Sequence, residues 1–146
     1  MTVTNEDGFS SSATRTVVVL DANDPIEGFY TVTPDSYRDY GGTIVEFGYP
    51  YEVLIIGEGD GVYSIDDLFG GWYSQRAGYG EDYNCSAYFT VDGSTMTVDP
   101  SDTFVAGWGD SIDSFHDASY NAAEGTFSYG ADYAGAMTFY VTLVKE

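Results

Sequence analysis

Short runs of β-forming residues recur along this chain, and turn signals that contain glycine separate them. Asp60-Gly61 and Asp92-Gly93 are the clearest of these signals, because a tight hairpin turn favours residues that accept positive φ. No segment shows a sustained helical period together with helix start and stop signals. The spacing predicts an all-β fold. We expect a small antiparallel barrel of about eight strands, of the lipocalin or streptavidin kind.

Several local features refine this expectation. Residues 28–38 are expected to form one strand, with Pro34 at its end or at a sheet edge. Residues 103–109 and 111–117 are expected to form two further strands, and a short helical turn could lie within residues 65–69. Cys85 is the only cysteine, so no disulfide can form within the chain. We expect Cys85 to be a small buried hydrophobic residue.

The N-terminal segment has a different character from the rest. Residues 2–20 are expected to form two strands around a turn at residues 6–8, the second strand being rich in valine. Two strands alone are marginal in water, so residues 17–20 should pack on another surface. The pattern resembles the closing hairpin of a bacterial immunoglobulin-like repeat. We therefore expect residues 1–21 to end such a domain, residues 22–26 to be a linker, and residues 27–146 to form the barrel.

The linker contains Asp21, Asn23 and Asp24 ahead of Pro25. This order resembles the calcium linker between cadherin repeats, although calcium needs about six or more oxygen ligands, more than these residues supply. A plain turn is the favoured interpretation, because Asx residues and proline both favour turns. We expect no other metal site, since the sequence has no pattern of cysteines and histidines that could bind one.

The charge of the chain limits its partners. Four basic residues stand against twenty-four acidic ones, which gives a net charge of −20. Nucleic acid is excluded as a partner, because phosphate binding needs clustered Lys and Arg. Direct contact with an anionic membrane surface is excluded for the same reason. The sequence has no apolar run of about 18 residues that would predict a transmembrane helix, and Met1 is not followed by a signal-peptide pattern.

Two glycine-flanked stretches gather aromatic and polar residues. Residues 63–83 contain Trp72 between glycines and tyrosines, and residues 105–111 place Trp108 between two glycines. Sugars stack their C–H faces on such rings and pair their hydroxyls with carboxylates, amides and guanidinium groups. We expect the two tryptophans to come close together at one end of the barrel. The candidate glycan-binding residues are Trp72, Tyr73, Gln75, Arg76, Tyr79, Trp108 and Asp110.

The same residues have a structural interpretation. Trp72 could instead plug the end of the barrel, which is the favoured alternative for this ring, whereas the two roles are equally balanced for Trp108. Asp66 and Asp67 could hold the loop by accepting hydrogen bonds from backbone N–H groups.

The strings GVYSIDDLFGGWYSQRAGYGEDY, AGWGDS and AGAMTFYVTLVKE carry a family resemblance. Together they resemble the C-terminal domain of Bacteroidetes cell-surface lipoproteins, a family without an assigned function. In that family a lipid-bearing cysteine and an immunoglobulin-like domain precede this domain, and many members are encoded beside glycan-uptake systems. The resemblance implies a parent protein at the cell surface, held at the outer membrane by a lipid anchor outside this chain. It implies a glycan, or a surface protein of an uptake system, as partner.

Catalysis is the less favoured interpretation. The single histidine, His116, precedes Asp117, but neighbours on a strand point to opposite faces, so we expect no dyad and a surface location. A glycoside hydrolase would need two carboxyl groups about 5–9 Å apart, one with a raised pKa, and the available candidates are Asp66, Asp67, Glu81 and Asp82. We expect a non-enzymatic domain without a cofactor, which binds a glycan or another surface component. The alternative is a structural or adhesion spacer without a small ligand.

Overall fold

The computed structural model describes residues 2–4, 10–12, 20–21 and 23–146. In the N-terminal segment, β1 (Thr2–Thr4) and β2 (Ser10–Ser12) pair antiparallel. Residues 17–19 of the valine-rich run lie outside the described residues. The assignment of this segment to an immunoglobulin-like domain, and the packing expected for residues 17–20, therefore stay predictions.

Eleven further strands form one antiparallel sheet. Its strands are β3 (Gly28–Val32), β4 (Tyr37–Tyr40), β5 (Thr43–Glu46), β6 (Tyr51–Gly59), β7 (Val62–Ile65), β8 (Cys85–Asp92), β9 (Thr95–Thr97), β10 (Thr103–Val105), β11 (Ser114–Asn121), β12 (Thr126–Tyr133) and β13 (Met137–Lys145). Eight of them follow the order β10-β8-β7-β6-β3-β13-β12-β11, while β4, β5 and β9 pair beside this path.

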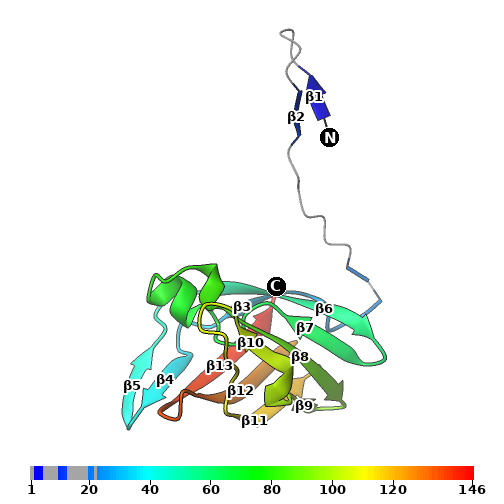
Figure 1. The fold of residues 1–146 in the computed structure, drawn as a ribbon. Helices are drawn as coiled ribbons and strands as arrows, with labels where there is room; N and C mark the ends of the chain where they lie inside the picture. Colours follow the sequence, from blue (N-terminus) through cyan, green and yellow to red (C-terminus); the bar gives the residue numbers. More distant parts are fainter. Residues whose placement is uncertain (1, 5–9, 13–19, 22) are drawn as a thin grey trace.

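The sheet curls into a half-barrel, as Figure 1 shows. The Tyr120 N–H of β11 donates to the Ser94 carbonyl at 2.9 Å, so the hairpin turn after β8 reaches the far edge of the sheet. The all-β, barrel-like fold predicted from the strand spacing is thus confirmed. The long strand β13 pairs with β12 along one edge and with β3 and β4 along the other.

One expected strand is divided in the structure. Residues 28–38 form β3 and β4, with a turn between them in which the Ser36 N–H donates to the Thr33 carbonyl at 3.0 Å. Pro34 lies in this turn, where its missing N–H costs no ladder bond. The buried Ser36 hydroxyl accepts from the Thr142 N–H at 3.0 Å, which ties the turn to β13. The single strand expected here is wrong because β13 pairs with the two halves separately.

The hairpin turns have the backbone geometry that their residues favour. Asp60 and Gly61, between β6 and β7, both have positive φ, at 55° and 75°. Positive φ at both central residues is typical of a type I′ turn, the geometry that matches strand twist. Gly93 has φ 60° between β8 and β9. Both turns predicted from the Asp-Gly pairs are confirmed.

Helical structure among the described residues is limited to three short segments. These are the π-type turn η1 (Trp72–Arg76) and the 3₁₀ turns η2 (Glu81–Tyr83) and η3 (Pro100–Asp102). The helical turn considered at residues 65–69 is wrong, because residue 65 ends β7 and the helical turn begins at Trp72. In the described part of the chain, no helix is long and apolar enough to cross a membrane.

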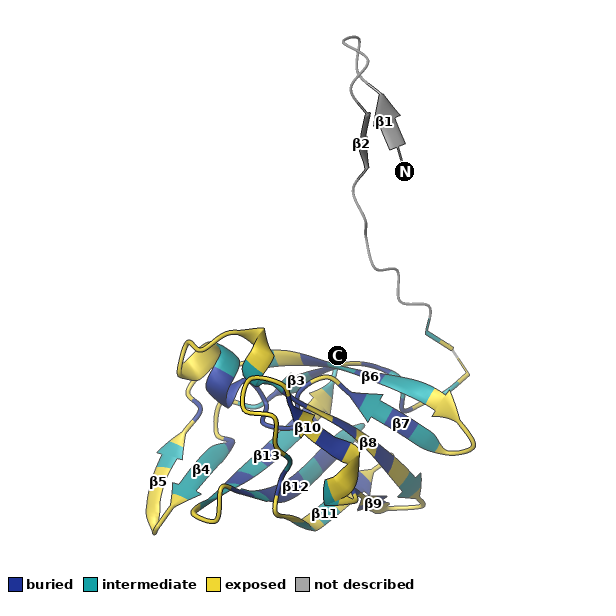
Figure 2. Ribbon diagram, in the orientation of Figure 1, coloured by how far each residue is buried: buried dark blue, intermediate teal, exposed yellow. Residues whose placement is uncertain are grey.

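The core lies on the concave face of the sheet. Buried residues alternate with exposed ones along most of β8 and with half-buried ones along most of β13, as Figure 2 shows by colour. This period of two directs one set of side chains inward and the other to solvent. Cys85 is fully buried, and burial raises the pKa of its thiol, so the small buried hydrophobe expected from the sequence is confirmed.

The expected strands at residues 103–109 and 111–117 are shorter or displaced. Residues 103–105 form β10, and the next four residues turn the chain around Trp108. The Gly109 N–H donates to the Val105 carbonyl at 2.7 Å, and Gly109 has φ 67°. This turn ends β10 early and delays β11 until Ser114, because the left-handed glycine reverses the chain.

Candidate functional site

The carboxylate of Asp67 organises the loop between β7 and β8. It accepts backbone N–H groups from Phe69 at 3.0 Å, Gly71 at 2.8 Å and Cys85 at 3.0 Å. Asp67 is only 1% exposed, and this burial raises its pKa to about 7 although the three N–H donors act to lower it. The structural role considered for Asp67 is therefore its observed role: it fixes the start of the aromatic loop.

Trp72 lies beneath the loop and not on its surface. It is 6% exposed and packs against Phe47 and Phe139, with ring centroids 5.4 Å and 5.9 Å away. The guanidinium carbons of Arg38 and Arg76 lie 4.5 Å and 5.2 Å from its ring centroid. The indole thus has the plug position considered from the sequence, and its faces are covered by protein.

Trp108, in contrast, is 44% exposed. The rings of Tyr73 and Tyr83 pack against the indole in edge-to-face contacts, with centroid distances of 4.7 Å and 4.5 Å. The angles between their planes and the indole plane are 79° and 67°. Tyr79, itself 56% exposed, lies 6.0 Å away and stacks on Tyr73. We call the exposed surface of Trp108, Tyr79 and Tyr83 the aromatic face.

The two glycine-rich loops meet under this face. The Gly107 N–H donates to the Asp82 carbonyl at 2.7 Å. A Cβ at Gly107 would lie 2.5 Å from the Tyr83 ring, so only glycine allows this approach. The loops that carry Trp72 and Trp108 thus come together as expected, with Tyr73 between the two indoles.

The remaining candidates from the sequence lie either beside the aromatic face or beside the buried Trp72. Asp110 is exposed beside the aromatic face, and its carboxylate accepts the Tyr133 hydroxyl at 2.6 Å. Arg76 lies over Trp72, and its Nε donates to the Glu46 carbonyl at 3.3 Å. Gln75 is exposed on η1 beside Arg76. The structure thus brings Tyr73, Tyr79, Trp108 and Asp110 together, and it places Arg76 with Trp72.

Arg38 is a candidate that the sequence analysis missed. It comes from β4, more than thirty residues before Trp72, and β4 reaches this ring only because it pairs with the start of β13. Figure 1 shows the β4–β5 hairpin close to the loop that follows β7. The rarity of basic residues was the one signal that could have marked Arg38.

Three of the four carboxylates considered for hydrolysis lie in a surface groove beside the aromatic face. Asp66, Glu81 and Asp82 line it together with Glu52 and Phe104. Asp66 accepts the Leu54 N–H at 3.0 Å, and burial raises its pKa. The fourth candidate, Asp67, is buried and already accepts three N–H groups. It is therefore not available to a substrate.

His116 differs from its expected arrangement. Its Nδ1 lies 2.8 Å from an Asp117 carboxylate oxygen, and its Nε2 lies 3.0 Å from Asp132. The expectation that His116 and Asp117 point apart is wrong, because β11 contains a bulge after His116 and Asp117 has φ 53°. Gly130 leaves room for the imidazole over β12, since a Cβ there would lie 2.7 Å from the ring.

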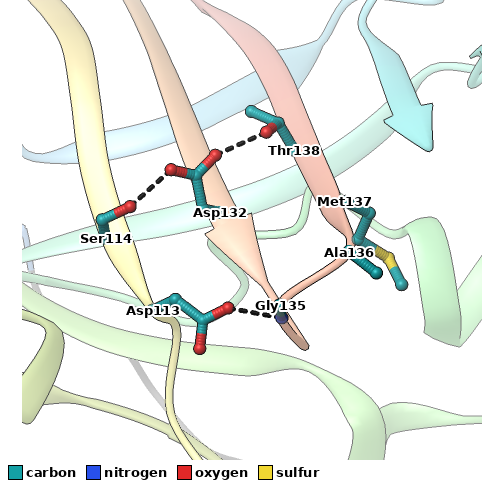
Figure 3. Close-up of a pocket in the computed structure, with 7 residues that line it drawn as sticks. All are labelled: Asp113, Ser114, Asp132, Gly135, Ala136, Met137 and Thr138. Carbon is teal, nitrogen blue, oxygen red and sulfur yellow. Dashed lines mark hydrogen bonds between the residues drawn. The ribbon is translucent and has the colours of Figure 1, made fainter. Parts of the chain in front are cut away.

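Asp132 joins three neighbouring strands in a small surface pocket (Figure 3). Its carboxylate accepts the hydroxyl groups of Ser114 on β11 and Thr138 on β13, and Asp113 accepts the Gly135 N–H at 2.7 Å. Ser114 therefore contacts an aspartate and not His116. A serine hydrolase needs its serine hydroxyl paired with the histidine base, so this cluster is a structural network.

A pH titration tests this network. Hydrogen bonds to Asp132 and Asp117 raise the pKa of His116 above 6.5, so its contribution to stability is complete below pH 6.5 and is lost as the pH rises through the folded-state pKa. Burial acts to raise the pKa of Asp132, but its donors outweigh this and lower it below 3.8, so its contribution is lost only as the pH falls through that lower value.

We therefore expect the network to stabilise the fold most between pH 3.8 and 6.5. The imidazole resonances should titrate above pH 6.5 by NMR, and His116→Gln should remove the loss of stability in that range. A histidine pKa at or below 6.5 would contradict the two ion pairs.

The linker carboxylates accept hydrogen bonds from backbone N–H groups. Asp21 accepts the Asn23 N–H at 2.9 Å, and Asp24 accepts the Ile26 N–H at 2.8 Å. The Asp21 N–H in turn donates to Glu27 at 2.7 Å. This is the plain Asx turn favoured from the sequence. Among the described residues, no group of three or more acidic, histidine or cysteine side chains is arranged to hold a metal ion.

Comparison with known proteins shows the family to which the domain belongs. Residues 20–145 match a family model described as a "-like, C-terminal domain". The fold is similar to the crystal structure of the lipoprotein BT2262 from Bacteroides thetaiotaomicron, with a TM-score of 0.82 and 38% sequence identity. The alignment covers 99% of this chain and 72% of that one. The chain belongs to this BT2262-like family of C-terminal domains. A comparison with curated proteins gives no match.

The match to the BT2262-like family includes every element of the candidate site. Residues 20–145 contain the loop held by Asp67, the turn around Trp108 and the β4 strand that carries Arg38. The resemblance to a Bacteroidetes lipoprotein domain inferred from the sequence is confirmed at this level. The site is therefore built within the shared domain.

Proposed function

We propose that this domain is a non-catalytic binding module of a bacterial surface lipoprotein, and that its aromatic face binds a glycan. The observation that carries the proposal is the exposed indole of Trp108, held edge-on by Tyr73 and Tyr83. A ring fixed in this way loses little conformational entropy when a ligand stacks on it.

The surroundings of the aromatic face fit a sugar. Exposed aromatic rings can cover the C–H face of a pyranose, and nearby polar groups can pair with its hydroxyls. Asp110 accepts the hydroxyl of Tyr133, whose ring lies 6.3 Å from that of Trp108. Asp82 and Glu81 precede Tyr83 and line the adjoining groove. These carboxylates can accept hydroxyl hydrogens, which gives a site of stacking and hydrogen bonding without a reaction.

The proposed setting is the outer surface of the cell. The relative with a solved structure is a lipoprotein, which supports a lipid-anchored parent protein for this domain. We propose that the anchor holds the parent at the outer membrane, and that the domain presents its ligand to, or acts beside, a surface protein of a glycan-uptake system.

A glycan screen followed by one substitution tests the proposal. Calorimetry on the domain with a panel of plant and host oligosaccharides should detect a ligand, and Trp108→Ala should weaken its binding by about tenfold or more. Removal of this half-exposed ring should change the melting temperature little. Tyr88→Ala is the matched control, because Tyr88 is 53% exposed on β8 outside the aromatic face and should leave binding unchanged.

The alternatives give different results in the same assays. A spacer without a small ligand would give no binding heat with any oligosaccharide of the panel, and this outcome would contradict the proposal. A hydrolase would use the acidic groove, where the pKa of Glu52 is raised by its hydrogen bond with Glu146 and that of Asp66 by burial. Turnover of chromogenic glycosides, lost in Asp66→Asn, would favour that reaction over simple binding.

A further inference from the structure

Two arginines converge on Trp72 in a strongly acidic protein. Of the four basic residues, Arg38 and Arg76 place their guanidinium groups within 4.5 Å and 5.2 Å of the same ring centroid. We call Arg38 and Arg76 the arginine pair. Lys145 lies elsewhere, with its Nζ donating to the Pro25 carbonyl at 2.6 Å.

The arginine pair has no carboxylate partner within the part of the chain that the structure describes. The ion pairs found there both belong to His116. The chain has twenty-four acidic residues, so a partner would be easy to supply. Charged side chains in folded proteins are usually paired when they are partly buried. Arg38 is partly buried and Arg76 is exposed, and both lie over the Trp72 ring, so their positive charge is available to an external anion.

The hydrogen-bonding of the arginine pair supports this interpretation. The Nε of Arg38 is buried and has no hydrogen-bond partner among the described residues. The Nε of Arg76 donates to the Glu46 carbonyl, which fixes the direction of an exposed side chain. Guanidinium groups recognise carboxylate and sulfate groups through paired N–H donors, and stacking on an indole orients them for that contact.

The arginine pair lies next to the aromatic face. Trp72 precedes Tyr73 on η1, and Tyr73 touches Trp108 at 4.7 Å. Burial raises the pKa of Tyr73 to about 12, and the nearby Arg38 charge acts in the opposite direction. The arginine pair and Trp108 are therefore connected through the consecutive residues Trp72 and Tyr73.

We propose that the glycan bound by this domain is anionic, with a carboxylate or sulfate group held by Arg38 and Arg76 while a neighbouring sugar stacks on Trp108. This inference rests on the proposed function. The acidic groove lined by Glu52, Asp66 and Glu81 repels an anion, which favours the arginine pair as the place where the acidic group is held.

Matched ligands test the charge requirement. Oligogalacturonate and its methyl-esterified form differ in the carboxylates, and chondroitin sulfate and its desulfated form differ in the sulfates. In calorimetry, at least one charged form should bind about tenfold or more tightly than its matched form, because a charge-assisted hydrogen bond is worth that much. The pair that shows the preference identifies the acidic group. Added salt should weaken the charged form selectively.

Matched variants test the arginine pair itself. Arg38→Gln and Arg76→Gln should each reduce the preference for the charged form by about tenfold and leave the weaker binding of the uncharged form in place. Lys145→Gln removes the same charge six residues beyond Phe139 on β13, roughly 20 Å from the site, and should leave the preference unchanged.

The possible outcomes separate this inference from the proposed function. Binding that is lost in Trp108→Ala but shows no preference for charged forms would overturn the inference and leave glycan binding standing. The same holds if the arginine variants melt earlier and keep the full preference, since the arginine pair would then only support Trp72. A flat response to every probe would overturn both.

Discussion

Replacement of Asp67 with alanine is expected to destabilise the domain by about 3–5 kcal/mol. The carboxylate accepts three backbone N–H groups, from Phe69, Gly71 and Cys85, in a fully buried position. Alanine would leave these donors without partners where water does not reach, and each unsatisfied group costs about 1–3 kcal/mol. Urea unfolding, with the midpoint and the slope fitted together, measures the change.

Asp66→Ala is the matched control for Asp67→Ala. Asp66 precedes Asp67 but lines the acidic groove at the surface, and its carboxylate accepts the Leu54 N–H. Its loss should cost about 1 kcal/mol or less. Equal destabilisation by the two variants would show that the loop does not depend on the buried carboxylate.

Trp72→Ala is the second change with a large expected effect, a loss of about 3–5 kcal/mol. The indole fills the space between Phe47 and Phe139, and its removal leaves a cavity that the sheet cannot close. The variant also leaves the guanidinium groups of Arg38 and Arg76 without the ring on which they rest. Thermal unfolding should show a melting temperature lower by about 6–20 °C, at 2–4 °C per kcal/mol for a domain of this size.

Trp108→Ala provides the comparison for Trp72→Ala. The same substitution at a ring that is 44% exposed should cost much less stability, because less of its surface leaves water on folding. Similar losses at both positions would mean that Trp108 is also a packing residue, and would remove the support for a stacking role. We thus expect Trp72 to contribute mainly to stability and Trp108 mainly to binding.

The hairpins were predictable from sequence because their information is local. Asp60-Gly61 accepts the two positive φ values that its turn requires, and no distant residue is needed to infer it. The division of residues 28–38 into β3 and β4 was not predictable in this way. It depends on the Ser36 hydroxyl reaching Thr142, which lies more than a hundred residues further along the chain.

The candidate site shows the same limit. The glycines around Trp72 and Trp108 predicted two shaped loops that meet, but they did not show how far each ring would be buried. Their different exposures follow from the curl of the sheet, which places Trp72 against Phe139 of β13 and leaves Trp108 on the turn after β10. Likewise, Asp117 faces His116 only because β11 contains a bulge, and no local sequence motif predicts this bulge.

The position of β13 has a consequence for the way this domain forms. β13 pairs with β12, β3 and β4, and it follows all of them along the chain. During synthesis, β3 and β4 can pair early with β6 and β5, but they gain their second partner only after residues 137–145 have been made. Pairing between such distant segments carries a high loop-closure entropy and slows folding. The domain is expected to collapse as one late unit, after its final strand has left the ribosome, with the N-terminal strands exposed to chaperones until then.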